Sequence, residues 1–113
     1  MLAAFEKSEP GFKGPKAEIF LVNENDRALV DSKVTPHPTG TFVQPIKLSA
    51  GGRERVAKKT YIRATRYQNP GFDKALAACK ADKSWTTVET NVPGHVIMLD
   101  APEWLADQLV QVA

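Results

Sequence analysis

The stretch NVPGHVIMLDAPEWLA, from Asn91 to Ala106, decides how the rest of the chain can be arranged. A strand expected over 85–90 leads into a Pro-Gly turn, and that turn presents His95. A helix is expected next, because Asp100 stands where an N-cap would and Glu103 follows it by three residues, as in a capping box. The stretch therefore predicts a strand, a histidine turn and a helix in direct succession.

The expected C-terminal helix is amphipathic. Pro102 falls in its first turn, a position that proline tolerates. Its buried stripe is predicted from apolar residues at i, i+4 and i+7, namely Leu105, Leu109 and Val112.

Working back along the chain, a second strand is predicted over 59–65, which is rich in β-branched and aromatic residues. A helix should follow, capped by Asn69 with Pro70 at its first position. Its apolar face would consist of Phe72, Leu76 and Cys79. Two strands joined by a helical crossover are expected to be parallel, with catalytic groups gathered beyond their carboxyl ends. His95 follows the last strand at that end.

A third strand is predicted over 41–48, where Pro45 removes a backbone donor and favours an edge or a bulge. Ser49 begins a turn, and a charged connector over 53–58 leads to the next strand. Residues 41–113 are therefore expected to form an α/β unit with about three parallel strands, crossover helices and a C-terminal helix.

Residues 1–40 are expected to form an irregular, partly helical segment, because Pro-Gly and Gly-Pro breakers interrupt its first part. Asn23 is predicted to cap a helix over 24–33. In that helix, Ala28 and Leu29 are expected to face inward.

Composition limits the classes of function. The chain has 113 residues, which corresponds to one domain, and a net charge of +2, too small to indicate a nucleic-acid or membrane partner. A single cysteine excludes an internal disulfide, and no apolar run is long enough for a transmembrane helix. We therefore expect a cytoplasmic protein. With two histidines, His37 and His95, and one cysteine, a metal site is not expected.

Four motifs together carry a family resemblance: YIRAT (61–65), NPGFD (69–73), PGH (93–95) and DAPEWLA (100–106). They resemble the C-terminal part of an α/β-hydrolase, of the small esterase or hydroxynitrile-lyase-like branch. The resemblance implies two last parallel strands, a catalytic histidine in the turn after the final strand, and a closing helix over the sheet. It extends back to about residue 26, where residues 25–44 are similar to the end of the family's lid segment, and residues 1–40 are therefore expected to be a lid-like, partly helical segment.

The resemblance also implies chemistry. A carboxylic-ester hydrolase would act on a small-molecule ester without a cofactor, and His95 would be the general base that takes a serine proton and returns it to the leaving group. Asp73 is a candidate for the acid of the triad. It also has a structural interpretation, because an acid in the first turn of a helix is favoured by the helix dipole.

The chain departs from the family at the nucleophile. The Gly-x-Ser-x-Gly motif is not found in these 113 residues. Ser49 has a glycine two residues after it but a lysine two residues before it, and is expected to be a turn residue. Cys79 is expected to be a small core residue. We therefore expect a C-terminal hydrolase fragment that is inactive alone.

A second hypothesis is a non-catalytic interaction module. A strand over 41–48 with no neighbour on one side would leave unpaired backbone groups, and such edges invite pairing with another chain or a second copy. A third hypothesis, an independent small enzyme that uses Ser49 or Cys79, ranks last.

Overall fold

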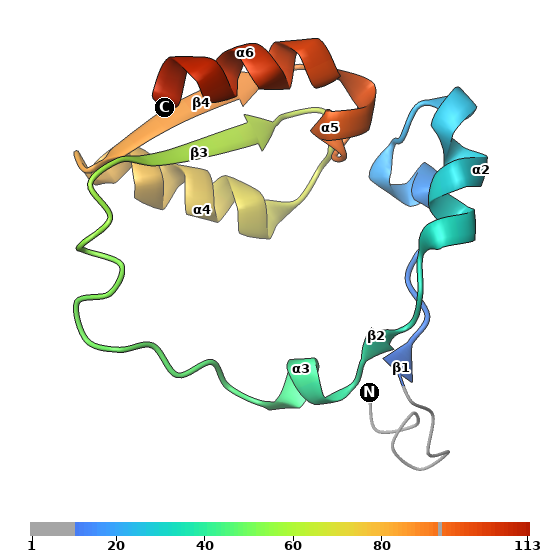
Figure 1. Ribbon diagram of the computed structural model, residues 1–113, viewed down its shortest axis with the longest axis horizontal. Coiled ribbons are helices and arrows are strands. Elements are labelled where there is room, and N and C mark those ends of the chain that lie inside the picture. The colour runs from blue at the N-terminus through green and yellow to red at the C-terminus, as the bar shows by residue number, and fades with distance from the viewer. Residues whose placement is uncertain (1–10, 93) are drawn as a thin grey trace.

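The structure, a computed structural model, describes residues 11–92 and 94–113. Its central unit is a parallel pair of strands, β3 (Lys59–Ala64) and β4 (Trp85–Thr90), joined by helix α4 (Pro70–Ala81) (Figure 1). The pairing runs from Lys59 opposite Trp85 to Ala64 opposite Thr90. The strand–helix–strand order and its parallel pairing are therefore confirmed.

Helix α4 begins where the sequence predicts. The side-chain oxygen of Asn69 accepts hydrogen bonds from the backbone N–H groups of Gly71 and Phe72, at 2.9 and 3.2 Å, and Pro70 occupies the first turn. Leu76 and Cys79 are buried against the strands. Burial of these two side chains makes α4 and the sheet the main apolar core.

The C-terminal helix begins differently from the prediction. A short helix, α5 (Ile97–Asp100), comes first, and α6 (Pro102–Val112) follows with Ala101 at the N-cap and no side-chain cap. The capping box at Asp100 is therefore wrong. The physical reason lies far away in the sequence, because the Asp100 carboxylate accepts hydrogen bonds from Asn23.

The predicted buried stripe of α6 is also wrong at one position. Leu109 is 55% exposed, whereas Leu105 and Val112 are half-buried. Trp104 and Gln108 share that partial burial. None of the helices in the described ranges is long and apolar enough to cross a bilayer.

The strand predicted over 41–48 is not formed. A short helix, α3 (Gly40–Val43), stands there instead, and residues 44–49 run without a strand partner. Ile46 and Leu48 are 81% and 73% exposed. A strand needs a neighbouring strand to form hydrogen bonds with its backbone N–H and C=O groups, and no other described strand lies alongside this segment. Within the described residues, the parallel sheet has two strands rather than three.

The leading segment is partly helical, as predicted. The strands β1 (Gly11–Phe12) and β2 (His37–Pro38) form a short antiparallel pair. The helices η1 (Ala17–Phe20) and α2 (Glu24–Lys33) lie between these two strands in the sequence. The Asn23 side chain caps α2 by accepting from the backbone N–H of Asp26.

The inward face predicted for α2 is wrong. Ala28 and Leu29 are both exposed, Leu29 to 52%, and no residue of α2 is buried. Helix α2 packs mainly against η1, which places Ala17 and Val22 in the buried positions of this segment.

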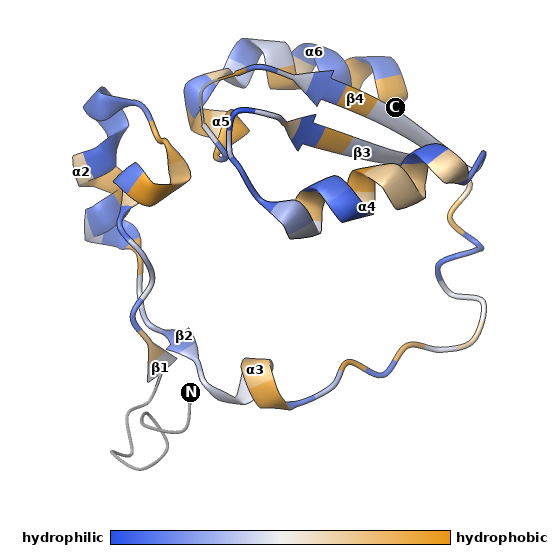
Figure 2. Cartoon of the chain, turned by 180° about the vertical axis from the view of Figure 1, so that it is seen from behind, coloured by the Kyte–Doolittle hydropathy of each residue, from blue (hydrophilic) through white to orange (hydrophobic). Residues whose placement is uncertain are grey.

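The chain is open for its length. Its radius of gyration is 17.0 Å, against roughly 13 Å for a compact domain of this size. Its accessible surface is 8695 Å², against roughly 6,100 Å² expected from its mass. Hydrophobic residues are prominent on α3 and recur along the connection to β3 (Figure 2). Much apolar surface is therefore left uncovered.

Candidate functional site

His95 lies just beyond the carboxyl end of β4 and close to the segment that follows β3. Its backbone N–H donates a hydrogen bond of 2.8 Å to the carbonyl of Phe20. Asn23 supports the same junction, because its backbone N–H and its side-chain amide donate to Oδ1 of Asp100 at 2.8 and 3.0 Å. The segment containing η1 and α2 therefore contacts the histidine turn, beside α5 (Figure 1).

Aromatic rings surround the imidazole of His95. The ring centroids of Tyr67, Phe72 and Phe20 lie 4.7, 5.1 and 5.8 Å from it, and the first two are stacked on it with interplanar angles of 27° and 16°. The Tyr67 and Phe72 centroids are 6.3 Å apart. This separation is much shorter than the sum of their distances to His95, so the two rings do not sandwich the imidazole. They form a triangle with it.

Asp73 does not hold the imidazole. Its Oδ1 accepts from Nε of Arg63 at 2.8 Å and lies 2.7 Å from Nη2 of the same guanidinium. Within residues 11–92 and 94–113, no carboxylate is hydrogen-bonded to the His95 ring. The two catalytic candidates suggested by the sequence are thus near one another in the fold but not directly joined, and Asp73 is the counter-ion of Arg63.

A small pocket of about 120 Å³ adjoins His95. Its lining comes from β3, from the start of α4 and from the histidine turn: Tyr61, Ile62, Arg63, Ala64, Phe72, His95 and Ile97. Apart from Arg63, the lining is apolar or aromatic with one histidine, and it would suit a small, uncharged group beside a proton acceptor.

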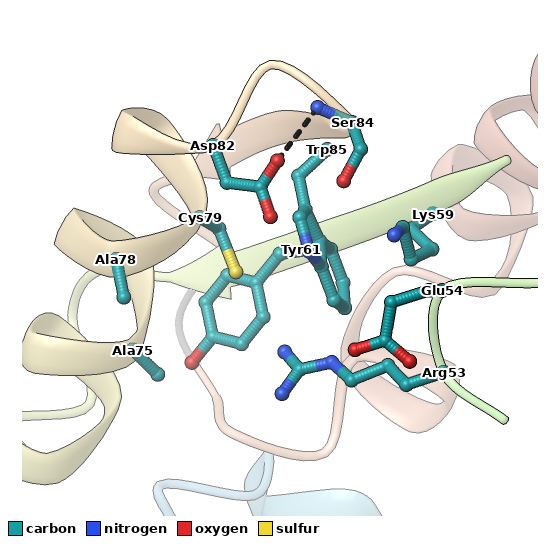
Figure 3. A pocket seen from close by; sticks show the side chains of 10 residues that line it. All are labelled: Arg53, Glu54, Lys59, Tyr61, Ala75, Ala78, Cys79, Asp82, Ser84 and Trp85. Carbon is teal, nitrogen blue, oxygen red and sulfur yellow. Dashed lines mark hydrogen bonds between the residues drawn. The ribbon is translucent and has the colours of Figure 1, made fainter. Parts of the chain in front are cut away.

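A larger hollow of about 670 Å³ lies at the opposite, amino-terminal end of the strands. Trp85 is central in it, with the guanidinium of Arg53 at 5.2 Å and the ammonium of Lys59 at 5.7 Å from a ring centroid (Figure 3). Asp82 lies at the rim, and hydrogen bonds from Ser84, together with the charges of Lys59 and Arg53, hold the pKa of its carboxyl below the ordinary value. Of the residues that line this hollow, Tyr61 also lines the small pocket at His95.

The remaining candidates lie outside both places or take structural positions. Ser49 accepts through its carbonyl from the N–H of Gly52 at 3.2 Å, as a turn residue does, and Cys79 is buried on α4. His37 is exposed in β2, with its ring 5.0 Å from that of Phe42. The described part of the chain holds no group of three or more candidate metal ligands.

Sequence reasoning missed three residues of the His95 environment. Phe20 is contributed by a distant segment and leaves no local signal. Tyr67 follows β3 by three residues and could have been suspected as a ring at the carboxyl end of a strand. Arg63 lies between Ile62 and Ala64 near the end of β3, and this gave the clearest missed signal, since a charge between apolar residues of a strand requires a partner when it is buried.

Comparisons with family models, with curated proteins and with solved structures give no match to this chain.

Proposed function

We propose that this chain is the histidine-bearing part of a carboxylic-ester hydrolase of the α/β-hydrolase type. The observation that carries the proposal is the position of His95, beyond the carboxyl end of one strand of a helix-connected parallel pair. Ligands and reacting groups of open parallel sheets gather at that end. The rings of Tyr67 and Phe72 add support, because they pack against the imidazole at that end of the strands, with centroids 4.7 and 5.1 Å from it.

The role proposed for His95 is that of general base. A neutral imidazole nitrogen would take the proton from a serine hydroxyl as its oxygen attacks the ester carbonyl. The imidazolium would then give that proton to the departing alkoxide, and water would release the acyl group by the same route. The serine belongs to a different stretch of polypeptide in this proposal.

The open form of the chain is consistent with a catalytic site whose serine and histidine come from different stretches of polypeptide. Large apolar side chains are exposed on the connection before β3, among them Ile46, Leu48 and Val56. Burial of apolar surface releases roughly 25 cal/mol per Å², so these residues favour association with further polypeptide. A nucleophile-bearing sheet is the kind of partner that the proposal requires.

The test combines labelling with a mass. An antibody against this chain would recover the protein from its source, and a fluorophosphonate probe would report an activated serine in what is recovered. We expect a labelled polypeptide that either contains this chain or remains bound to it. Recovery of a 12.4 kDa species alone, with no labelled partner, would contradict the proposal.

The isolated chain provides the second arm. We expect no turnover of a simple activated ester by the 113-residue chain, because it carries no nucleophile motif. Turnover that persists in His37→Ala and is lost in His95→Ala would show that the chain is a complete enzyme by itself.

A second candidate function is self-association through a sheet edge. The edge expected at 41–48 does not exist as a strand, but β3 pairs with β4 on one side and has no partner on its other side among the described strands. Unpaired strand edges favour addition of another strand. Light scattering across a range of concentrations tests this function, with a dimer and slowed amide exchange along β3 as the expected result. A monomer at all concentrations would exclude it.

A further inference from the structure

Arg63 is the most unusual charged residue of the described chain. It is the fifth of the six residues of β3, and its side chain is 3% exposed although the chain as a whole buries little. A buried guanidinium is costly unless its donors find acceptors. The partners of Arg63 therefore indicate what its burial achieves.

All three nitrogens of the guanidinium donate hydrogen bonds within residues 64–73, which run from the end of β3 to the first turn of α4. Nη1 donates to the carbonyl of Ala64, Nη2 donates to the carbonyl of Tyr67 at 2.9 Å, and Nε donates to Asp73 at 2.8 Å. The guanidinium thus joins the end of β3, the middle of the connection and the first turn of α4. A planar fork can hold several acceptors in a fixed arrangement, which a lysine ammonium does less well.

The segment fixed in this way carries the two rings that stack on the imidazole. Tyr67 is itself bound through its carbonyl, and Phe72 immediately precedes the bound Asp73. The guanidinium carbon also lies 5.9 Å from the centroid of the Phe72 ring. Arg63 and His95 line the same small pocket, although no hydrogen bond joins them within the described residues.

We propose that Arg63 is a positioning residue for His95. It fixes the 64–73 connection, and the connection presents Tyr67 and Phe72 to the imidazole. Asp73 serves in this arrangement as the counter-ion that permits Arg63 to be buried, a role distinct from that of a triad acid. The inference rests on the proposed function insofar as His95 acts in catalysis, but the positioning itself can be measured without any ester turnover.

The measurement is the NMR spectrum of the imidazole in the full 113-residue chain. Since the chain has two histidines, His37→Ala leaves the His95 signals alone and assigns them. Stacked aromatic rings displace nearby proton resonances, so the His95 ring protons should differ from those of an unfolded peptide. Tyr67→Leu should move them toward the unfolded positions and thereby identify the contribution of the stack.

The decisive variants are Arg63→Met, which keeps the apolar stem, and Arg63→Lys, which keeps the charge but not the fork. We expect both to move the His95 resonances in the same direction as Tyr67→Leu. Lys80→Met is the matched control. It removes an ion pair of 2.6 Å between α4 and Glu89 of β4 while leaving the 64–73 connection intact, and it should leave His95 unchanged.

The inference is overturned if a folded Arg63→Lys or Arg63→Met variant retains the parent resonances of His95. It is equally overturned if Lys80→Met moves them as far. Should both Arg63 variants fail to fold, Asp73→Asn is the deciding variant. The Asp73 side chain is 57% exposed, and the substitution weakens only the contact between Arg63 and residue 73, leaving the bonds to Ala64 and Tyr67. A displaced His95 signal then supports the inference, and an unchanged one contradicts it.

The two proposals fail separately. If the resonances move as expected but no fluorophosphonate-labelled partner is found, the positioning role stands and the hydrolase function is wrong. If a labelled partner is found but the His95 resonances do not move, the hydrolase function stands and the positioning role of Arg63 is wrong.

Discussion

The carboxylate of Asp100 occupies the space that a side chain at position 94 would need. Its Oδ2 stands where a Cβ on Gly94 would be placed, and the carbonyl oxygen of Leu21 would lie 2.8 Å from that Cβ. Gly94 is buried. The close approach of α5 and the leading segment therefore leaves no room for a side chain at position 94.

The Gly94→Ala substitution should destabilise the protein. A methyl group placed against the Asp100 carboxylate and a backbone carbonyl should cost about 1–3 kcal/mol, the usual range for overpacking. Urea unfolding would measure the loss. Gly40→Ala is the control, because nothing lies within 4 Å of a Cβ at that position. Equal effects of the two substitutions would contradict this account.

Truncation of Asp100 should partly relieve that clash. Asp100→Ala alone should cost about 1–3 kcal/mol, because it leaves the backbone N–H of Asn23 without its acceptor and removes one of the two acceptors of the Asn23 side-chain amide, the other being Asp26. Combined with Gly94→Ala, the total loss should be smaller than the sum of the single losses. A double-mutant cycle measures this coupling, and strict additivity would show that the carboxylate and position 94 do not compete for space.

The core between α4 and the strands should be the most sensitive part of the chain. Leu76 is 8% exposed, and replacement of a buried leucine by alanine should cost about 2–5 kcal/mol. Leu109→Ala, on the exposed side of α6, should change the free energy of unfolding far less. A comparable loss at both positions would mean that α6 is covered in solution by a contact outside the described chain.

Asp82 should make the junction of α4 and β4 sensitive to acid. Hydrogen bonds from the backbone and side chain of Ser84 lower the pKa of its carboxyl in the folded protein, and the charges of Lys59 and Arg53 act in the same direction. The unfolded chain therefore binds the proton more readily. The stabilisation from Asp82 is fully present above the ordinary aspartate pKa of about 4, and it is lost as the pH falls through the lowered folded value.

The measurement is the free energy of unfolding as a function of pH. In Asp82→Asn, the part of the acid-induced loss that comes from Asp82 should disappear, so the curve should be flatter below about pH 4. Asp107→Asn, on the exposed surface of α6, is the control. An unchanged acid limb in Asp82→Asn would show that the Ser84 hydrogen bonds are not maintained in solution.

The parts of the fold that could be predicted are those with local causes. Asn69 and Pro70 start α4 through contacts within three residues, and the β-branched content of 59–65 and 85–90 favours strands. The prediction of a strand over 41–48 was wrong because a strand depends on a neighbouring strand, and local composition does not show whether one is present. The prediction that Asp100 caps the C-terminal helix was wrong for a related reason, since Asn23, far away in the sequence, donates hydrogen bonds to its carboxylate. The position of His95 followed from local order, whereas its environment of rings did not.

The hydrogen bonds between Asn23 and Asp100 span 77 residues of sequence, whereas β3, α4 and β4 close on one another consecutively within residues 59–90. The chain entropy lost on joining two segments grows with the length between them. The strand–helix–strand unit should therefore form early during folding, and the leading segment should attach last. In the folded protein this attachment should also open first, by partial unfolding that leaves the sheet intact. Each such opening would uncover the side of His95 that Phe20 covers in the folded protein, while the pocket formed by the other residues around His95 would remain.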